Sequence, residues 1–406
     1  MTEEQIELLT ERLVERINKA NIYFYKKIGS AIKQIKELTP TQAYQLSQIL
    51  KYGGSYEEII KEISKYTNLN IQDIDDIFRI YAEKDQLFYE KFYKYRNIPF
   101  IPIKENTALR NQVQAFANIV KKEMYDYTKQ NLIGFTINGK FMNIKDTYNY
   151  VIDEAVLNVS QGKETFDEAM RQILKDIGGS GLKTVDYKSG RKVRLDSTIR
   201  THLKSELREV HNELQEVYGK EFGADGIEIT AHENPAIDHA PVQGLQFSKE
   251  EFNKLQNGEV AQEYNSKKYY TLDHDGKNGY RPISQMNCYH IVFSIVLGVS
   301  KPAYTKEELQ QIIDRNNKGF EYEGKHYTMY EGEQLLRQVE RKIREQKDIQ
   351  ILAKESNDKD LILESQQKIT QLTQKYKEIC NVSGLPPKRD RLSVSGYSRV
   401  AKSKLK

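Results

Sequence analysis

The chain has 406 residues, of which 30% are charged and 38% hydrophobic, and its formal net charge is +4. Because a single hydrophobic core usually stops growing near about 250 to 300 residues, this length predicts a chain that folds in more than one part. The richest apolar stretch, residues 291–299, has about half of the roughly 20 residues that cross a bilayer, so no membrane span is expected.

The N-terminal part is predicted to be a helical domain over residues 1–178. Near its start, six apolar residues recur at spacings of three and four, which places them on one face of a helix. They are Ile6, Leu9, Leu13, Ile17, Ala20 and Phe24. Further helices are expected at residues 43–52, 56–66, 71–93, 108–128, 146–159 and 165–177, with breaks at 68–70 and 97–99. Gly178 and Gly179 are expected to end the last of these helices.

Residues 179–330 are predicted to form a small α+β core that is rich in loops. A short strand and turn at 185–193 precede a long helical pattern at 195–218. Strands are expected at 227–229 and within 291–299, and alternating aromatic residues on either side of Glu323-Gly324 predict a hairpin within 319–330.

The C-terminal part, residues 331–383, is predicted to be a long helix with a short coiled-coil-like seam, interrupted by the polar stretch 353–360. The seam comprises Ile362, Ser365, Ile369, Leu372, Tyr376 and Ile379. The seam is shorter than three heptads, so it could pack either on the rest of its own chain or on a second copy of the protein. Residues 384–406 are predicted to be a basic, flexible tail. The expected fold class is therefore α+β, mainly helical.

The densest group of chemically versatile side chains lies in the central region. Cys288 and His290 alternate, so both are expected to point to the same side, where they could hold zinc together with His232 or His239. Zinc signatures with close ligand pairs at each end are absent from the sequence, so no cofactor is expected. The favoured interpretation is a polar network buried under loops.

Catalysis by Cys288 is the competing interpretation of this group. His290 or His239 could act as the base and Asp238 could orient it. No pattern places the cysteine at a helix N-terminus or in an electropositive cleft, which favours a packed cysteine. Residues 273–279 resemble a calcium loop superficially but lack the ligand positions that should follow, so a solvated turn is predicted.

The two cysteines of the chain do not suggest a disulfide framework. The first residues also lack a basic start followed by an apolar block, so neither a secretory signal nor an organellar presequence is expected, and the protein is predicted to stay in a reducing cytoplasm. The sequence contains no phosphate-binding loop, dinucleotide-binding fingerprint or nucleophile elbow, so an ATP-driven activity is not expected.

Basic residues gather in the tail and could neutralise the phosphates of nucleic acid; the alternative is a solubilising end. The candidates are Lys388, Arg389, Arg391, Arg399, Lys402, Lys404 and Lys406. A second basic run, within residues 337–347, is interleaved with glutamates, and its helical spacing favours a solvated, salt-bridged face.

Short motifs follow one another in a fixed order between residues 185 and 347. They contain Tyr187, Gly190, Arg191, Asp238, His239, Gln243, Gly244, Asn287, Cys288 and His290, and a charged helix from 334 to 347 comes last. In order and spacing they resemble the phage minor capsid protein 2 family, which is distantly similar to the Mu F-like head-morphogenesis proteins. The N-terminal helices and the tail lie outside this resemblance.

The resemblance implies a structural minor capsid protein in the head of a tailed bacteriophage, near the portal, that acts by binding in head assembly or in DNA packaging or ejection. Its implied partners are the portal protein, the major capsid protein or both, with packaged DNA contacted through the tail. The implied location is the virion, assembled in the bacterial cytoplasm, with no enzymatic activity and no membrane partner. The alternative is a metal-dependent hydrolase or a toxin-like effector carried in the virion.

Overall fold

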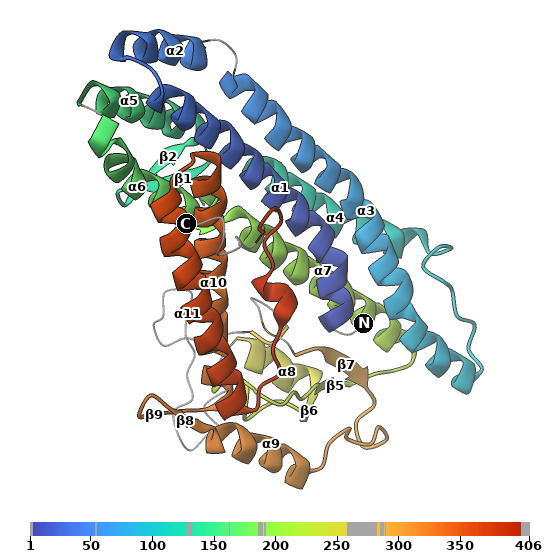
Figure 1. The fold of residues 1–406 in the computed structure, drawn as a ribbon. Coiled ribbons are helices and arrows are strands. Elements are labelled where there is room, and N and C mark those ends of the chain that lie inside the picture. Colours follow the sequence, from blue (N-terminus) through green and yellow to red (C-terminus); the bar gives the residue numbers. More distant parts are fainter. Residues whose placement is uncertain are drawn as a thin grey trace. The chain divides into compact units, whose positions relative to one another are not determined.

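The structure, a computed structural model, describes residues 3–52, 55–127, 132–161, 163–185, 190, 192–257, 282–284, 288 and 290–398 (Figure 1). Its α-helices are α1 (Glu3–Lys36), α2 (Pro40–Tyr52), α3 (Ser55–Arg96), α4 (Thr107–Tyr127), α5 (Ile144–Gln161), α6 (Lys163–Ser180), α7 (Leu195–Glu221), α8 (Lys249–Gln256), α9 (Lys306–Lys318), α10 (Met329–Glu355) and α11 (Lys359–Ser383). Its strands are β1 (Ile133–Ile137), β2 (Lys140–Asn143), β3 (Lys183–Val185), β4 (Lys192–Arg194), β5 (Gly226–Ile229), β6 (Gln246–Ser248), β7 (Val292–Ile295), β8 (Phe320–Tyr322) and β9 (Lys325–Tyr327). The mainly helical α+β class is confirmed.

The chain divides into two compact units, each built from separate segments. The first unit contains Met1–Thr10, Asp73–Lys121 and Thr201–Gln334, and the second contains Glu11–Gln72, Lys122–Arg200 and Leu335–Lys406. These units do not follow the domain boundaries predicted at residues 178, 330 and 383. The physical reason is that α1, α3, α4, α7 and α10 each contribute residues to both units, which helical periodicity does not reveal.

The second unit contains a four-stranded antiparallel sheet with the order β2-β1-β3-β4. Phe24 of α1 stacks on Phe135 of β1 with ring centroids 4.5 Å apart, so the predicted apolar face of α1 contributes to this core. The purely helical array expected for residues 1–178 is therefore wrong at β1 and β2. Asn138 and Gly139 join these strands with φ angles of 49° and 75°, as a type I′ turn requires.

Two predicted helix ends are also wrong. The break expected at 68–70 is absent because α3 continues through it, and the side chain of Asn70 donates to the Leu13 carbonyl at 3.1 Å. A buried tertiary hydrogen bond thus compensates for a residue with poor helix propensity. Helix α6 also continues past Gly178, where an added Cβ would lie 2.7 Å from the Cα of Ile349. This glycine permits close packing against α10.

Helices α10 and α11 form an antiparallel hairpin (Figure 1). The interruption predicted within 353–360 is confirmed, because α10 ends at Glu355 and Asp358 caps the N-terminus of α11. Five of the six seam residues are buried, and Tyr376 in the seam donates to Glu340 of α10 at 3.1 Å. The seam therefore packs on its own chain, which decides between the two partners that the sequence left open.

The first part of the tail also packs against its own unit. The Lys347 ammonium lies 4.8 Å from the centre of the Tyr397 ring, and Lys388 donates its backbone N–H to the Tyr376 hydroxyl at 2.9 Å. The flexible end predicted from residue 384 is thus wrong for residues 384–398. Aromatic and backbone contacts, which net charge does not indicate, hold this segment in place.

A buried cluster of charges lies at the centre of the second unit. Arg194 contacts Asp196 and Asp348, each at 3.2 Å, and Arg344 lies 4.0 Å from Asp196. Burial alone would raise the pKa of Asp196, but Arg194 and Arg344 lower it below its usual value. Burial raises the pKa of Asp348 to about 6 despite Arg194. One residue of the basic run at 337–347, Arg344, therefore faces the buried carboxylate of Asp196, whereas Arg341 and Lys342 are exposed, as predicted for a solvated face.

These shifts predict a pH dependence of stability. A carboxyl whose pKa is higher in the folded protein stabilises the fold below its unfolded pKa of about 4, and this stabilisation is lost as the pH rises through the folded value. Asp348→Asn mimics the neutral acid. Between about pH 4 and about pH 7, the unfolding free energy of the wild type should therefore fall by roughly 2 to 3 kcal/mol more than that of Asp348→Asn.

Urea denaturation at a series of pH values measures the difference. Asp196→Asn is the matched control, for which the pH dependence should have the opposite sign. Because the pKa of Asp196 is lowered in the folded protein, its carboxylate stabilises the fold above the unfolded pKa, and this stabilisation is lost as the pH falls. Parallel pH profiles for the wild type and Asp348→Asn would contradict the assignment.

The first unit contains the loop-rich part of the predicted central core. Strands β6, β5 and β7 form an antiparallel sheet in that order, and β8 and β9 form the predicted hairpin. One face of the sheet packs on α8, with Ile229, Phe247, Leu255 and Val292 in a common apolar cluster. This cluster fixes the loop that follows β5 and the segment that precedes β7.

Candidate functional site

Two segments of the first unit carry the candidate side chains. The loop after β5 turns at Ala236, whose carbonyl accepts from the backbone N–H groups of His239 and Ala240 at 3.0 and 2.9 Å. The second segment leads into β7 and carries Cys288 and His290. Ser284 donates its hydroxyl to the His290 carbonyl at 2.9 Å, which holds the second segment in place.

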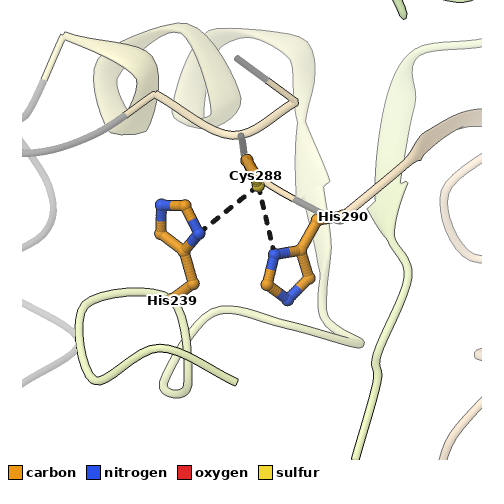
Figure 2. Close-up of side chains that lie close together, drawn as sticks. All are labelled: His239, Cys288 and His290. Carbon is orange, nitrogen blue, oxygen red and sulfur yellow. Dashed lines mark hydrogen bonds between the residues drawn. The ribbon is translucent and has the colours of Figure 1, made fainter. Parts of the chain in front are cut away.

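The two segments bring three metal-ligating side chains together. The Cys288 sulfur lies 3.4 Å from Nδ1 of His239 and 3.3 Å from Nδ1 of His290 (Figure 2). The three ligand atoms all lie within 4.8 Å of one another. The residues are 4%, 2% and 1% exposed for Cys288, His239 and His290, so the cluster is buried. The side chains of Cys288 and His290, which precede strand β7, converge as their alternation predicted.

Gln243 fixes the orientation of one imidazole. Its side-chain oxygen accepts from the backbone N–H of His232 at 3.1 Å and lies 3.2 Å from Nε2 of His290. A backbone N–H can only donate, so the atom between these groups must be the amide oxygen. An oxygen there requires a proton on Nε2 of His290, which directs the opposite ring nitrogen, Nδ1, at the cysteine sulfur.

Asp238 and His232 flank the cluster. Asp238 is buried, and its carboxylate lies 3.7 Å from Nε2 of His239, the ring nitrogen that faces away from Cys288. The ring of His232 packs on that of His290 with centroids 4.3 Å apart, and burial lowers the pKa of His232 to about 4. His232 is therefore a neutral packing partner, outside the three converging ligands.

The thiol of Cys288 is electrostatically tuned. Burial alone would raise its pKa, but the interaction with His239, chiefly their hydrogen bond, lowers it below its usual value. A thiolate is the form that binds metals and attacks electrophiles. The arrangement of cysteine, histidine and carboxylate can therefore support either chemistry, and its burial limits access for a substrate.

The other predicted site residues are distributed as follows. Gly244 adopts φ +70°, and a Cβ there would lie 2.3 Å from Leu309, so it serves close packing. Gly190 belongs to the second unit and is exposed. Tyr187, Arg191, Asn287, Arg399, Lys402, Lys404 and Lys406 lie outside the described residues. In the tail, Lys388 and Arg389 are exposed and Arg391 is partly buried.

A second buried polar group in this unit was missed by sequence reasoning. Nδ1 of His211 in α7 lies 2.7 Å from the Asp85 carboxylate of α3, and Nε2 lies 2.8 Å from the Val292 carbonyl of β7. The side-chain amide nitrogen of Gln215 also lies 3.3 Å from Nε2. His211 connects two helices to the strand that follows the cluster. A lone histidine in a helical pattern gives no signal for this role.

Comparison with known proteins agrees with the motifs. The family model for Phage minor capsid protein 2 matches residues 1–381. The chain therefore belongs to this family and is a structural bacteriophage protein. The match includes the N-terminal helices, which the motifs had placed outside the resemblance, so that limit was wrong. No match was found among curated proteins or solved structures. Among the described residues, no helix is both long and apolar enough to cross a membrane.

The position of Gln243 predicts its effect on stability. Gln243→Leu removes the acceptor shared by the His232 backbone and the His290 ring, and each buried hydrogen bond lost costs roughly 1 to 3 kcal/mol. We expect the unfolding free energy to fall by roughly 2 to 5 kcal/mol, measured by chemical denaturation. Gln243→Glu keeps an acceptor oxygen and should cost less. Equal stability of Gln243→Leu and the wild type would contradict this role.

Proposed function

We propose that the protein acts in the phage head by binding, as a minor capsid component near the portal, and that it catalyses no reaction. The observation that carries the proposal is the family match over residues 1–381. The burial of Cys288, His239 and His290 supports it, because a hydrolase or toxin-like effector must expose its nucleophile or metal to a substrate.

The partners in this proposal are the portal protein, the major capsid protein or both, met during head assembly or during DNA packaging and ejection. Each compact unit offers exposed apolar side chains of the kind that protein interfaces bury, among them Ile49 of α2 and Val299 after β7. Unpaired apolar surface on both units is suited to a component that is held by several neighbours.

Photo-crosslinking in infected cells tests the location. A photoreactive amino acid at position 49 or 299 should give adducts with portal or major capsid protein in purified heads. Lys325, an exposed polar position, is the control and should give at least tenfold fewer adducts. Absence of the protein from purified DNA-filled and empty heads, or adducts with neither partner, would contradict the proposal.

Contact with packaged DNA through the tail is part of the same proposal. Four of the seven candidate cations, Arg399, Lys402, Lys404 and Lys406, follow the packed segment, whereas Lys388 and Arg389 are exposed within it. Truncation after residue 398 removes the four cations and keeps the contacts of Tyr397 with α10. The truncation therefore separates loss of charge from loss of fold.

The salt dependence of DNA binding measures this contact. Each phosphate contact contributes about 0.9 to the slope of log K against log salt concentration, so the truncation should lower the slope by up to about 3 to 4. The double substitution of Lys388 and Arg389 by Gln should lower it by up to about 2. An unchanged slope in both variants would exclude the tail as a DNA contact.

A further inference from the structure

We infer that the cluster of Cys288, His239 and His290 binds a zinc ion through the cysteine sulfur and the two Nδ1 atoms. The three atoms come from two segments of the first unit, and all three side chains are buried. The inference goes beyond the proposed function, which requires no metal.

The distances match a tetrahedral zinc site. Zinc binds sulfur at about 2.3 Å and imidazole nitrogen at about 2.0 to 2.1 Å, which places the two ligand atoms roughly 3.5 Å apart at the tetrahedral angle. The observed separations from the Cys288 sulfur are 3.4 Å to His239 and 3.3 Å to His290. The two Nδ1 atoms lie within 4.8 Å of each other, and they must come to about 3.3 Å for both to bind one tetrahedral ion.

Proton counting favours an ion over a hydrogen-bonded triad. A thiol has one proton and can donate it to only one of the two ring nitrogens that face it. The Gln243 oxygen faces Nε2 of His290, and the Asp238 carboxylate lies 3.7 Å from Nε2 of His239. With the proton of each ring on Nε2, both Nδ1 atoms present a lone pair to the sulfur. A cation between a thiolate and two lone pairs interacts favourably with all three atoms at once.

The surrounding groups are those expected around a metal centre. Metal-bound histidines usually donate their other ring N–H to a carboxylate, carbonyl or amide oxygen, which fixes the tautomer. Gln243 takes this position behind His290, and Asp238 lies behind His239 at 3.7 Å. The Asp238 carboxylate also balances the single positive charge that remains when zinc binds one thiolate and two neutral imidazoles.

The ligand chemistry selects the ion. Calcium and magnesium require oxygen ligands, whereas one sulfur and two imidazole nitrogens suit zinc. Three protein ligands leave the fourth position of the tetrahedron to another group, and burial of all three limits access of a substrate to that position. Because the ion would connect His239 with Cys288, 49 residues further along the chain, its binding free energy would stabilise the fold of the central region.

The first experiment measures zinc in the purified full-length chain by mass spectrometry. We expect about one zinc per chain in the wild type, and a loss of at least tenfold in Cys288→Ser and in His290→Ala. Cys380→Ser is the matched control, since Cys380 is also a buried free cysteine but lies in α11, and it should retain its zinc. Equal zinc contents in Cys288→Ser and Cys380→Ser would overturn the inference.

A second measurement covers the case in which a substituted chain does not fold. Wild-type protein stripped with a chelator is titrated with Co²⁺, whose thiolate coordination produces a sulfur-to-metal charge-transfer absorption. We expect this absorption to saturate at one equivalent and to disappear on adding zinc, and the melting temperature to rise on reloading. A wild-type chain that binds neither ion stoichiometrically overturns the inference whatever the variants do, and leaves the proposed capsid role untouched.

Discussion

The amide oxygen of Gln243 accepts hydrogen bonds from the His232 backbone and the His290 ring, and the loop-rich centre of the protein depends on this shared acceptor. A loop that is buried must find partners for its polar groups inside the protein, because water does not reach them. The glutamine satisfies two donors and orients an imidazole in the same contact. The cluster with Cys288 follows from this orientation.

In the second unit, too, buried polar groups need partners inside the protein, but there the groups are charged. Arg194 is partly buried between the buried carboxylates of Asp196 and Asp348, and burial of a charge is tolerated only when it is paired and hydrogen-bonded. Both units thus place polar networks where their segments meet. Such networks define one arrangement of the chain, whereas apolar packing alone tolerates several.

Much of the candidate site could be predicted, and the limits have physical causes. The alternation of Cys288 and His290 predicted that both point to one side, and their ligand atoms do converge, although both residues precede strand β7. The choice between His232 and His239 stayed open, because it depends on how a distant loop folds back. Local rules also failed at Asn70, where a tertiary hydrogen bond keeps the helix continuous. The Asn138-Gly139 pair is a sequence signal for a hairpin, but the helical patterns on both sides of it led to a purely helical prediction.

By itself the sequence determined the helices, the mainly helical class, the family and the residue types of the cluster, since these depend on periodicity, propensity and short motifs. Only the tertiary structure decided which imidazole joins Cys288, which tautomer His290 adopts, and that α11 packs on α10 of its own chain. It also decided that α1, α3, α4, α7 and α10 are shared between two compact units. The reason is that these outcomes depend on contacts between residues far apart in the chain, whose free energies no local pattern encodes.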